Sequence, residues 1–397
     1  MVLNRKRFLK FVLRLLLMRL LLFLSFWAII FLVNSCSTAR HTTVPGTINH
    51  LKFLSEYNVP YNKIFQNTII GGLSGIDYEP RENVYYIISD DRSEKNPARF
   101  YKVGITISND KIDSVIFFDT KVLKNRAGNV YSDAHNDPYH TPDPEAIRYN
   151  PKRNTLVWSS EGERLVRPNK VILEDPSITE INPDGTYIDT FKLPPQLHMG
   201  VTESGPRQNG VFEGLTFANN YKTLFADVEE PLYDDGSRAG LNDSTGIIRI
   251  LKFDVASKKT LAQYGYTIDA VSHKPNPPGS FIINGVSEIL SLGGDKLLLI
   301  ERSFSTGRLA CTVKIFIADL SGADNIKDIP SLKDSRDVKM ASKKLLLNMD
   351  SLGIYIDNIE AVTFGPKLHG GRRTLLFVSD NNFLPIQKTQ FLLFEIE

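Results

Sequence analysis

Short runs of alternating apolar and polar residues, separated by polar turns, make up most of the chain after residue 50. Residues 209–230, NGVFEGLTFANNYKTLFADVEE, are the clearest example. An alternating run is followed by an Asn-Asn turn and a second apolar run, the pattern of a β-hairpin. The acids of this hairpin open the first run and close the second: Glu213, and then Asp227, Glu229 and Glu230. Because hairpin strands are antiparallel, we expect all four acids at one end.

The same pattern occurs five times along the chain. The segments that carry it are residues 71–93, 142–163, 209–230, 284–303 and 357–382. Each has a leading residue near its start, and these are separated by 71, 68, 75 and 72 residues: Ser74, Glu145, Glu213, Glu288 and Glu360. A trailing acid follows at 16 residues in the first three segments, 13 in the fourth and 20 in the fifth: Asp90, Glu161, Glu229, Glu301 and Asp380. A shared period together with a shared internal distance indicates a repeat architecture.

Each of the first four hairpins is followed by two further strand-like runs, so that one repeat supplies four strands. Four-stranded units that recur radially are typical of a β-propeller, and five copies predict an all-β fold of five four-stranded antiparallel blades. Six blades remain an alternative if a long segment between repeats hides a divergent blade. The fifth repeat lacks a fourth strand, and we expect the strand-like residues 50–57 to supply it and close the ring. The propeller domain is therefore predicted over residues 50–397.

Residues 1–35 predict a secretory signal. They contain six basic residues and no acid, and an apolar run at 20–33 ends just before Ser35 and Cys36. Cys36 after the expected cleavage point resembles a bacterial lipobox, which implies lipidation of that residue. Met18 is then a candidate for the true start, and an uncleaved anchor helix is the alternative. Residues 36–49 would form a tether, which predicts a lipid-anchored protein of the bacterial cell envelope that faces the periplasm or the exterior.

The charge of the chain argues against nucleic-acid binding. The net charge is +2, but without the six basic residues of the signal the remainder has 41 Lys and Arg against 45 Asp and Glu, which is −4. Cys311 is the one cysteine besides Cys36, and its apolar surroundings predict a small buried side chain without a disulfide. We expect a monomer that meets the membrane through its lipid anchor alone.

The innermost strands of a propeller line its central channel, so the leading residues are expected to converge at one mouth of that channel. The leading glutamates are the candidate metal ligands: Glu145, Glu213, Glu288 and Glu360. Several carboxylates in one funnel require protons, arginine partners or a cation, because like charges about 4 Å apart repel by ~4 kcal/mol at an effective dielectric of 20. Oxygen ligands in this number favour Ca²⁺ over Mg²⁺ or Zn²⁺. The arginines near these positions, which offer the alternative of ion pairing, are Arg92, Arg148, Arg164 and Arg302.

Other residues near the predicted mouth are candidates for chemistry. Arg207 and Arg302 could grip a phosphate or a carboxylate, since a guanidinium binds such groups through two parallel hydrogen bonds. Asp227 or Glu161 could accept a proton. His140, in a loop rich in Asp, His and Pro, is either a general base or a surface histidine. The chain contains neither a G-x-S-x-G nucleophile elbow nor a P-loop.

The segments GGLSGIDY…YYIISDD, DPEAIRY…LVWSSEGE, FEGLTF…LFADVEE and NIEAVTF…LFVSDNN resemble the phytase-like family, "esterase-like activity of phytase", over most of residues 65–397. The resemblance implies a secreted propeller related in outline to the calcium-dependent β-propeller phytases. We therefore expect a Ca²⁺-assisted hydrolase of a small phosphoester or another ester, with its site at the acidic mouth. The alternative is a non-catalytic propeller that binds a ligand or a protein and holds Ca²⁺ for structure. Phytic acid is only one candidate substrate, because no dense Lys/Arg cluster is present.

Overall fold

The computed structural model describes residues 48–242, 244–333 and 337–397. The predicted signal, Cys36 and most of the predicted tether lie outside the described residues, so those predictions stay open. Within the described ranges, no helix is both long and apolar enough to cross a membrane. The helical segments there are three 3₁₀ turns of three or four residues each: η1 (Pro195–Leu197), η2 (Met349–Leu352) and η3 (His369–Gly371).

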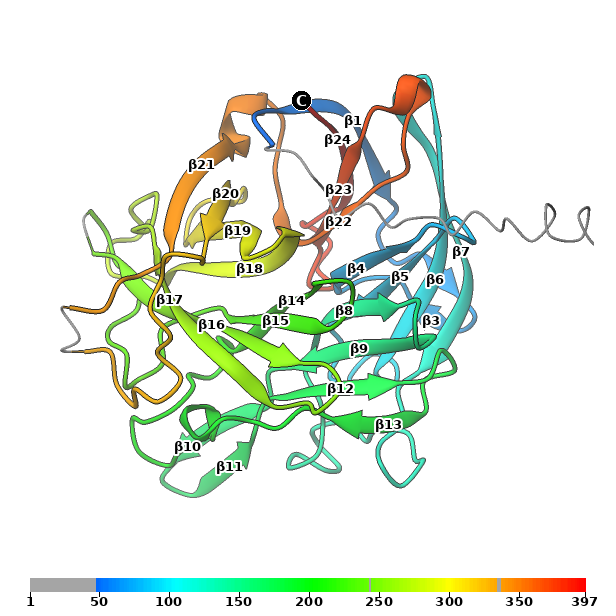
Figure 1. Ribbon diagram of the computed structural model, residues 1–397. Helices are drawn as coiled ribbons and strands as arrows, with labels where there is room; N and C mark the ends of the chain where they lie inside the picture. Colours follow the sequence, from blue (N-terminus) through cyan, green and yellow to red (C-terminus); the bar gives the residue numbers. More distant parts are fainter. Residues whose placement is uncertain (1–47, 243, 334–336) are drawn as a thin grey trace, which may run out of the picture. The chain divides into compact units, whose positions relative to one another are not determined.

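Five four-stranded antiparallel sheets form a β-propeller, which confirms the predicted fold class (Figure 1). Blade 1 consists of β4 (Leu73–Glu79), β5 (Val84–Ser89), β6 (Arg99–Ser108) and β7 (Lys111–Val122). Blade 2 consists of β8 (Pro144–Asn150), β9 (Thr155–Ser160), β12 (Ser177–Ile181) and β13 (Tyr187–Thr190). Blade 3 consists of β14 (Phe212–Ala218), β15 (Thr223–Val228), β16 (Gly246–Asp254) and β17 (Thr260–Ile268). Blade 4 consists of β18 (Ile282–Gly293), β19 (Lys296–Ser305), β20 (Thr312–Asp319) and β21 (Ser342–Asn348).

Blade 5 joins the two ends of the described chain. Its inner strands are β22 (Asn358–Phe364), β23 (Thr374–Asp380) and β24 (Thr389–Ile396), and its outermost strand is β1 (Leu51–Val59). The pairing of β1 with β24 runs from Leu51 opposite Ile396 to Val59 opposite Thr389. The predicted closing strand is thus confirmed, and the open edge that β24 would otherwise expose is covered (Figure 1).

Two small hairpins extend the blades and have no counterpart in the sequence prediction. One is β10 (Glu163–Arg167) with β11 (Lys170–Glu174), inserted between the second and third strands of blade 2. The other is β2 (Ile64–Phe65) with β3 (Thr68–Ile69), ahead of blade 1. Both are short, and the exposed Val166 and Val171 of the first show that it lies outside the main core.

The core consists of apolar side chains packed between adjacent blades. One cluster joins blades 1 and 2 around Ile88 and Trp158, and another joins blades 4 and 5 around Leu298 and Phe377. Cys311 lies in the second of these clusters as a buried free thiol, as its apolar surroundings predicted. The alternating pattern of each strand thus places one apolar face against each neighbouring blade.

Arg148, on the inner strand of blade 2, ties the five blades together at the channel. Its guanidinium is buried and donates hydrogen bonds to one backbone carbonyl from the inner strand of every other blade: Ile76, Leu215, Ile289 and Val362. The inner strand of each blade has a neighbour on one side only, so these carbonyls have no ladder partner. The guanidinium of Arg148 therefore supplies hydrogen-bond donors to carbonyl groups of four blades at once.

Candidate functional site

The inner strand of every blade contains a β-bulge. The ladder shifts register around one position in each case: between Leu73 and Gly75, Pro144 and Ile147, Phe212 and Leu215, Val286 and Glu288, and Ile359 and Ala361. Bulges are common beside functional sites because they re-aim a side chain that would otherwise follow the pleat. The residues at the five equivalent leading positions are Ser74, Glu145, Glu213, Ser287 and Glu360.

This register corrects the sequence alignment of blade 4 by one residue. Val286 pairs with Glu301, so the leading position belongs to Ser287 and the trailing position, one residue beyond the pair, belongs to Arg302. The separation of leading and trailing residues then becomes 15 rather than 13, close to the 16 of the first three blades. The short spacing was the signal in the sequence that Glu288 and Glu301 were misaligned.

Glu288 accordingly occupies a different environment from the other predicted metal ligands. It stands where the other blades carry Gly or Ala, and its carboxylate is fully buried 2.6 Å from Nη2 of Arg148. The backbone amides of Leu215 and Ile289 donate to its Oε1 at 3.1 and 2.9 Å. Glu288 does not line the mouth, so it is the counter-ion of Arg148 rather than a member of the ring.

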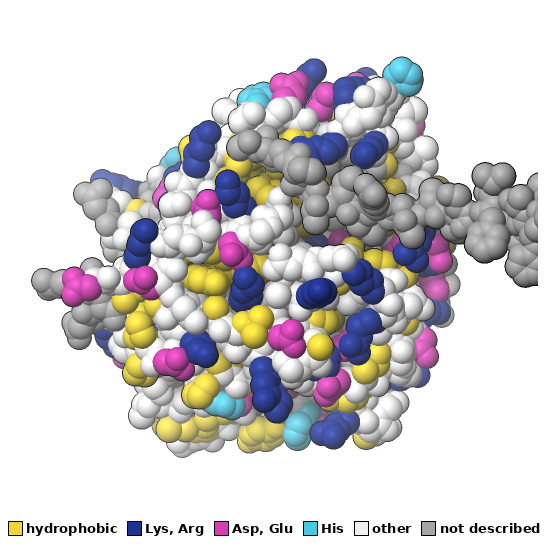
Figure 2. Space-filling model, viewed as in Figure 1, with side chains coloured by type: hydrophobic (Ala, Val, Ile, Leu, Met, Phe, Trp, Pro, Cys, Tyr) yellow, Lys and Arg dark blue, Asp and Glu magenta, His cyan; other side chains and the backbone are white. Residues whose placement is uncertain are grey.

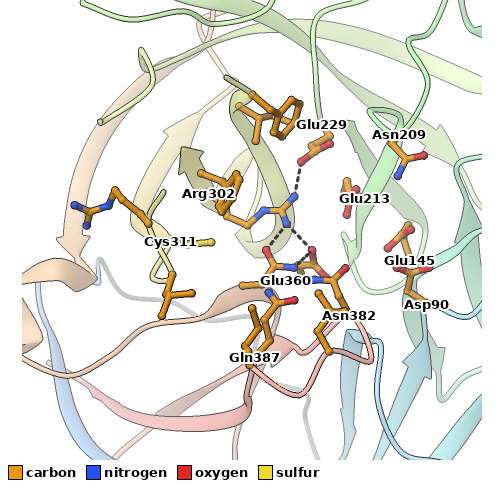
Figure 3. Close-up of a pocket in the computed structure, with 18 of the residues that line it drawn as sticks. Asp90, Glu145, Asn209, Glu213, Glu229, Arg302, Cys311, Glu360, Asn382 and Gln387 are labelled. Carbon is orange, nitrogen blue, oxygen red and sulfur yellow. Dashed lines mark hydrogen bonds and ion pairs between the residues drawn. The ribbon is translucent and has the colours of Figure 1, made fainter. Parts of the chain in front are cut away.

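The leading and trailing positions surround a cavity of about 480 Å³ at one end of the channel (Figure 3). Seven residues from these positions line it: Asp90, Glu145, Glu161, Glu213, Glu229, Arg302 and Glu360. Figure 3 shows Asp90, Glu145 and Glu213 on one side of the space and Arg302 with Glu229 and Glu360 on the other. The cavity therefore has two electrostatically different halves.

The acidic mouth, formed by Asp90, Glu145, Glu161 and Glu213, has the donor set of a metal site. One carboxylate oxygen from each of Glu145, Glu161 and Glu213 lies within 4.8 Å of the others, and none of these residues is more than 8% exposed. Asp90 and Asp143 form a second such group with Glu145. These buried clusters could bind a metal ion.

Two of these carboxylates lack protein partners. Neither Glu145 nor Glu213 forms a side-chain hydrogen bond or an ion pair with any residue in the part of the chain that the structure describes. Glu161 accepts a hydrogen bond at Oε1 from the amide of Val211 at 2.6 Å, which leaves its Oε2 available. Unpaired carboxylates that face a cavity are the groups that a hard cation would satisfy.

Burial and mutual repulsion raise the pKa values of this cluster. Desolvation is the largest cause at Glu145, Glu161 and Glu213, and the neighbouring carboxylates raise each pKa further, Asp90 at Glu145 and Glu229 at Glu213. The pKa of Asp90 is raised for the same two reasons, with Asp143 as its main neighbour. Without a cation, these groups would therefore hold protons at pH values where exposed carboxylates are ionised.

Arg302 neutralises the carboxylates in the other half of the cavity. Its Nη2 lies 2.6 Å from Glu229 and its Nη1 lies 2.6 Å from Glu360, and Nη1 also donates to Asn358 (Figure 3). Burial alone would lower the pKa of Arg302, but the carboxylates of Glu360 and Glu229 raise it, so the guanidinium stays charged. Glu360, predicted as a metal ligand, is thus already paired.

The remaining predicted residues lie outside the cavity. Asp227 is buried beside it, accepts a hydrogen bond from the amide of Gly214 at 3.0 Å, and its pKa is raised chiefly by burial. Arg207 donates to the carbonyls of Pro231 and Gly236, and its guanidinium stacks 4.1 Å from the ring centre of Tyr233.

His140 is exposed, with Nδ1 2.9 Å from Asp137. None of Asp227, Arg207 and His140 lines the cavity. The described structure therefore brings together Glu145, Glu161, Glu213, Glu360 and Arg302 from the predicted set.

Sequence reasoning missed two groups of residues in or beside the cavity. Asp143 belongs to the acidic cluster but precedes a leading residue instead of occupying a repeat position. The other group is apolar, and its members come from the ends of strands and from loops: Phe281, Ile283, Phe304, Leu309, Tyr355, Leu384 and Ile386. No periodic pattern marked the loop residues of this group.

A model of the phytase-like family, "esterase-like activity of phytase", matches residues 68–383, which is most of the chain and all of the acidic mouth. The chain belongs to the phytase-like family. A comparison with curated protein sequences found no match.

Among solved structures, this phytase-like propeller is similar to an α-L-arabinofuranosidase from Lactobacillus brevis, with 9% identity, a TM-score of 0.42, and 82% of this chain and 91% of that one covered. It is also similar to an exo-β-1,3-galactanase from Phanerochaete chrysosporium, with 12% identity, a TM-score of 0.44, and 86% and 64% covered. A gluconolactonase from Xanthomonas campestris gives 11% identity, a TM-score of 0.32, and 87% and 89% covered. At these identities and scores, none of the three bears on the activity of this chain.

Proposed function

We propose that this phytase-like propeller is a cation-assisted hydrolase of phosphoesters or related esters, with its site at the acidic mouth. One observation carries the proposal: Glu145 and Glu213 present buried, unpartnered carboxylates to the same cavity that Arg302 lines from the opposite side. A purely structural arrangement would not require like charges to converge on an open space.

The donor set favours Ca²⁺ as the cation. Glu145, Glu161 and Glu213 offer hard oxygen ligands, and Asp90 lies within reach of the same Glu145. Water or substrate oxygens would complete the six to eight ligands that Ca²⁺ accepts. When bound, such an ion supplies Lewis-acid polarisation of the ester and a more acidic water. The other tasks fall to side chains of the chain itself.

Arg302 would bind the anionic group of the substrate and stabilise negative charge that develops on it. Its two carboxylate partners hold the guanidinium at the cavity wall, so its position requires no rearrangement. The mouth contains more carboxylates than cationic groups, so an anionic substrate would bind after the cation has lowered the local negative charge. We therefore expect substrate affinity to depend on the cation.

Asp90 is the best-placed proton acceptor. It lines the cavity and is partly exposed, whereas Asp227 does not line it, and Glu161 is needed as an oxygen ligand. In the proposed reaction, the oxygen of a water molecule bonds to the phosphorus or the acyl carbon. The ester oxygen departs with the electrons of the broken bond, and Asp90 takes the proton that the water loses.

The alternative is a binding propeller in which the same cation is structural. The pairing of both Nη atoms of Arg302 favours it, because a guanidinium held by two carboxylates has less capacity for a third anion. Hydrolysis of p-nitrophenyl phosphate and p-nitrophenyl acetate by the full chain, with Ca²⁺ and with chelator, separates the two. Ca²⁺-dependent turnover of either substrate supports the hydrolase. Absence of turnover of both substrates in both conditions overturns it in favour of the binding propeller.

Lipidation at Cys36, an envelope location and a monomeric state stay part of the proposal. The charged surface agrees with a protein that binds no nucleic acid, since basic and acidic side chains are interspersed on the face shown in Figure 2. Intact-mass measurement of membrane-extracted protein tests the anchor. A mass that begins at Cys36 with added acyl chains supports lipidation, and a mass that retains residues 1–35 contradicts it.

A further inference from the structure

Apolar side chains line the cavity on the side of Arg302, opposite the acidic mouth. We use the term apolar wall for six of the residues that line it: Phe281, Phe304, Leu309, Tyr355, Leu384 and Ile386. They come from blades 4 and 5, at the end where the leading and trailing positions lie. The wall therefore borders the same space as the carboxylates.

Part of this wall is exposed. Phe281, Leu309, Leu384 and Ile386 are between 46% and 67% exposed, and they are four of the fifteen large apolar side chains that are at least 40% exposed in the described residues. Single exposed apolar side chains are ordinary, but a cluster that lines a cavity marks a surface that binds something apolar. These four side chains gather around one opening instead of spreading over the blades.

Local contacts hold the wall in place. The rings of Phe281 and Phe304 lie 6.3 Å apart, and the hydroxyl of Tyr355 donates to the carbonyl of Leu309 at 3.1 Å. Phe304 follows Arg302 by two residues on β19, so both side chains project from the same face of that strand. The apolar wall thus starts directly beside the guanidinium of Arg302. The charged part and the apolar part of the site are therefore continuous.

We infer that the substrate is an amphiphilic phosphoester, with its phosphate between the acidic mouth and Arg302 and an alkyl or aryl group on the apolar wall. This inference rests on the proposed function for the location of the phosphate. A polyphosphorylated sugar fits poorly, because Arg302 and Arg308 are the only cationic side chains among the described residues that line the cavity. The ligand could be a free alkyl phosphate or the headgroup of a lipid, since both have the same chemistry.

The test is the dependence of affinity on chain length. Ethyl, butyl and hexyl phosphate are titrated calorimetrically into the full chain with Ca²⁺ present. Each methylene on the wall should tighten binding by about two- to fourfold, so hexyl phosphate should bind at least about tenfold more tightly than ethyl phosphate. Equal affinities across the series, or no binding of any member, would overturn the inference.

A variant of the loop between β23 and β24 tests where the alkyl chain of the ligand lies. The double substitution Leu384→Ser with Ile386→Ser changes two exposed side chains between β23 and β24, so folding should be retained. It should flatten the chain-length dependence and leave ethyl phosphate affinity within about twofold of the wild type. Ile64→Ser, at an exposed apolar position of β2, is the matched control and should keep the full dependence. A double variant that keeps the dependence contradicts the assignment of the wall.

Vesicles of phosphatidylcholine with added phosphatidic acid distinguish the two sources of the ligand. Vesicle binding that the double substitution abolishes supports a lipid, and binding of hexyl phosphate without vesicle binding supports a free amphiphile. Failure of the proposed hydrolysis would look different, because chain-length-dependent binding would persist while no ester was turned over.

Discussion

Replacing Arg148 by Met should remove a large part of the stability of the propeller. The substitution keeps an apolar stem of similar length but deletes the guanidinium that donates to Ile76, Leu215, Ile289 and Val362. It also leaves the carboxylate of Glu288, which is fully buried, without its counter-ion. Both losses occur where all five blades meet.

The structure gives the magnitude of the effect. Breaking a buried ion pair by removing one partner typically costs 3–5 kcal/mol, and each buried carbonyl that loses its donor adds about 1 kcal/mol. Because the contributions overlap, we expect the free energy of unfolding to fall by about 5 kcal/mol. That is a large share of the ~5–15 kcal/mol that ordinary domains possess.

Urea denaturation monitored by tryptophan fluorescence is the assay. The midpoint should fall with little change in the slope, since the surface exposed on unfolding is nearly the same. The double variant Arg148→Met, Glu288→Met should recover part of the loss, because it no longer buries an unpaired charge. Arg126→Met, at an exposed position, should stay within about 0.5 kcal/mol of the wild type. A loss below about 2 kcal/mol for Arg148→Met, or no recovery in the double variant, would refute this account of the channel.

Three further predictions concern the mouth. In chelator, thermal stability should fall as the pH rises above the ordinary glutamate pKa of 4.5, because burial raises the pKa values of Glu145 and Glu213, and stability present below the unfolded-state pKa is lost as the pH rises through the folded-state value; a thermal midpoint that rises with pH above 4.5 contradicts the shift. Arg302→Lys keeps the charge but cannot bridge Glu229 and Glu360 together, so kcat for ester hydrolysis should fall by about 100-fold in steady-state kinetics, and a value within twofold of the wild type would exclude the proposed role. Gly214→Ala should cost about 1–3 kcal/mol in urea denaturation, because a Cβ there would lie 2.4 Å from Asp227 Oδ1 and 2.5 Å from the backbone nitrogen of Ile289; an unchanged midpoint would show that the bulge can relax.

The repeat was the part of the fold that sequence reasoning could predict. Strand alternation and a period near seventy residues recur in every blade, and the strand at residues 50–57 was recognisable because the fifth repeat lacked its fourth member. The register of blade 4 could not be predicted as easily. The β-bulge adds one unpaired residue beside Glu288, and a bulge leaves no fixed mark in the alternating pattern.

Sequence reasoning predicted which residues near the mouth carry charge, and it predicted most of their ion pairing. Three of the four arginines proposed to pair with acids do so: Arg92 with Asp143 and Glu163, Arg148 with Glu288, and Arg302 with Glu229 and Glu360. Arg164 instead donates to the carbonyls of Gly200 and Thr202. The apolar wall was not predicted, because it assembles from loops that are distant in sequence and adjacent only in the folded ring.

Cation binding at the acidic mouth is the central claim, and the stability gained on adding Ca²⁺ tests it most directly. A ligand that binds only the folded state at a hundred times its dissociation constant stabilises that state by about 2.7 kcal/mol. The wild-type chain should therefore gain about this much in urea denaturation with Ca²⁺ present, and Asp113→Asn, an exposed acid on β7, should gain as much. Glu213→Gln should lose most of the gain. A wild-type stability that Ca²⁺ leaves unchanged, or an undiminished gain in Glu213→Gln, would contradict the claim.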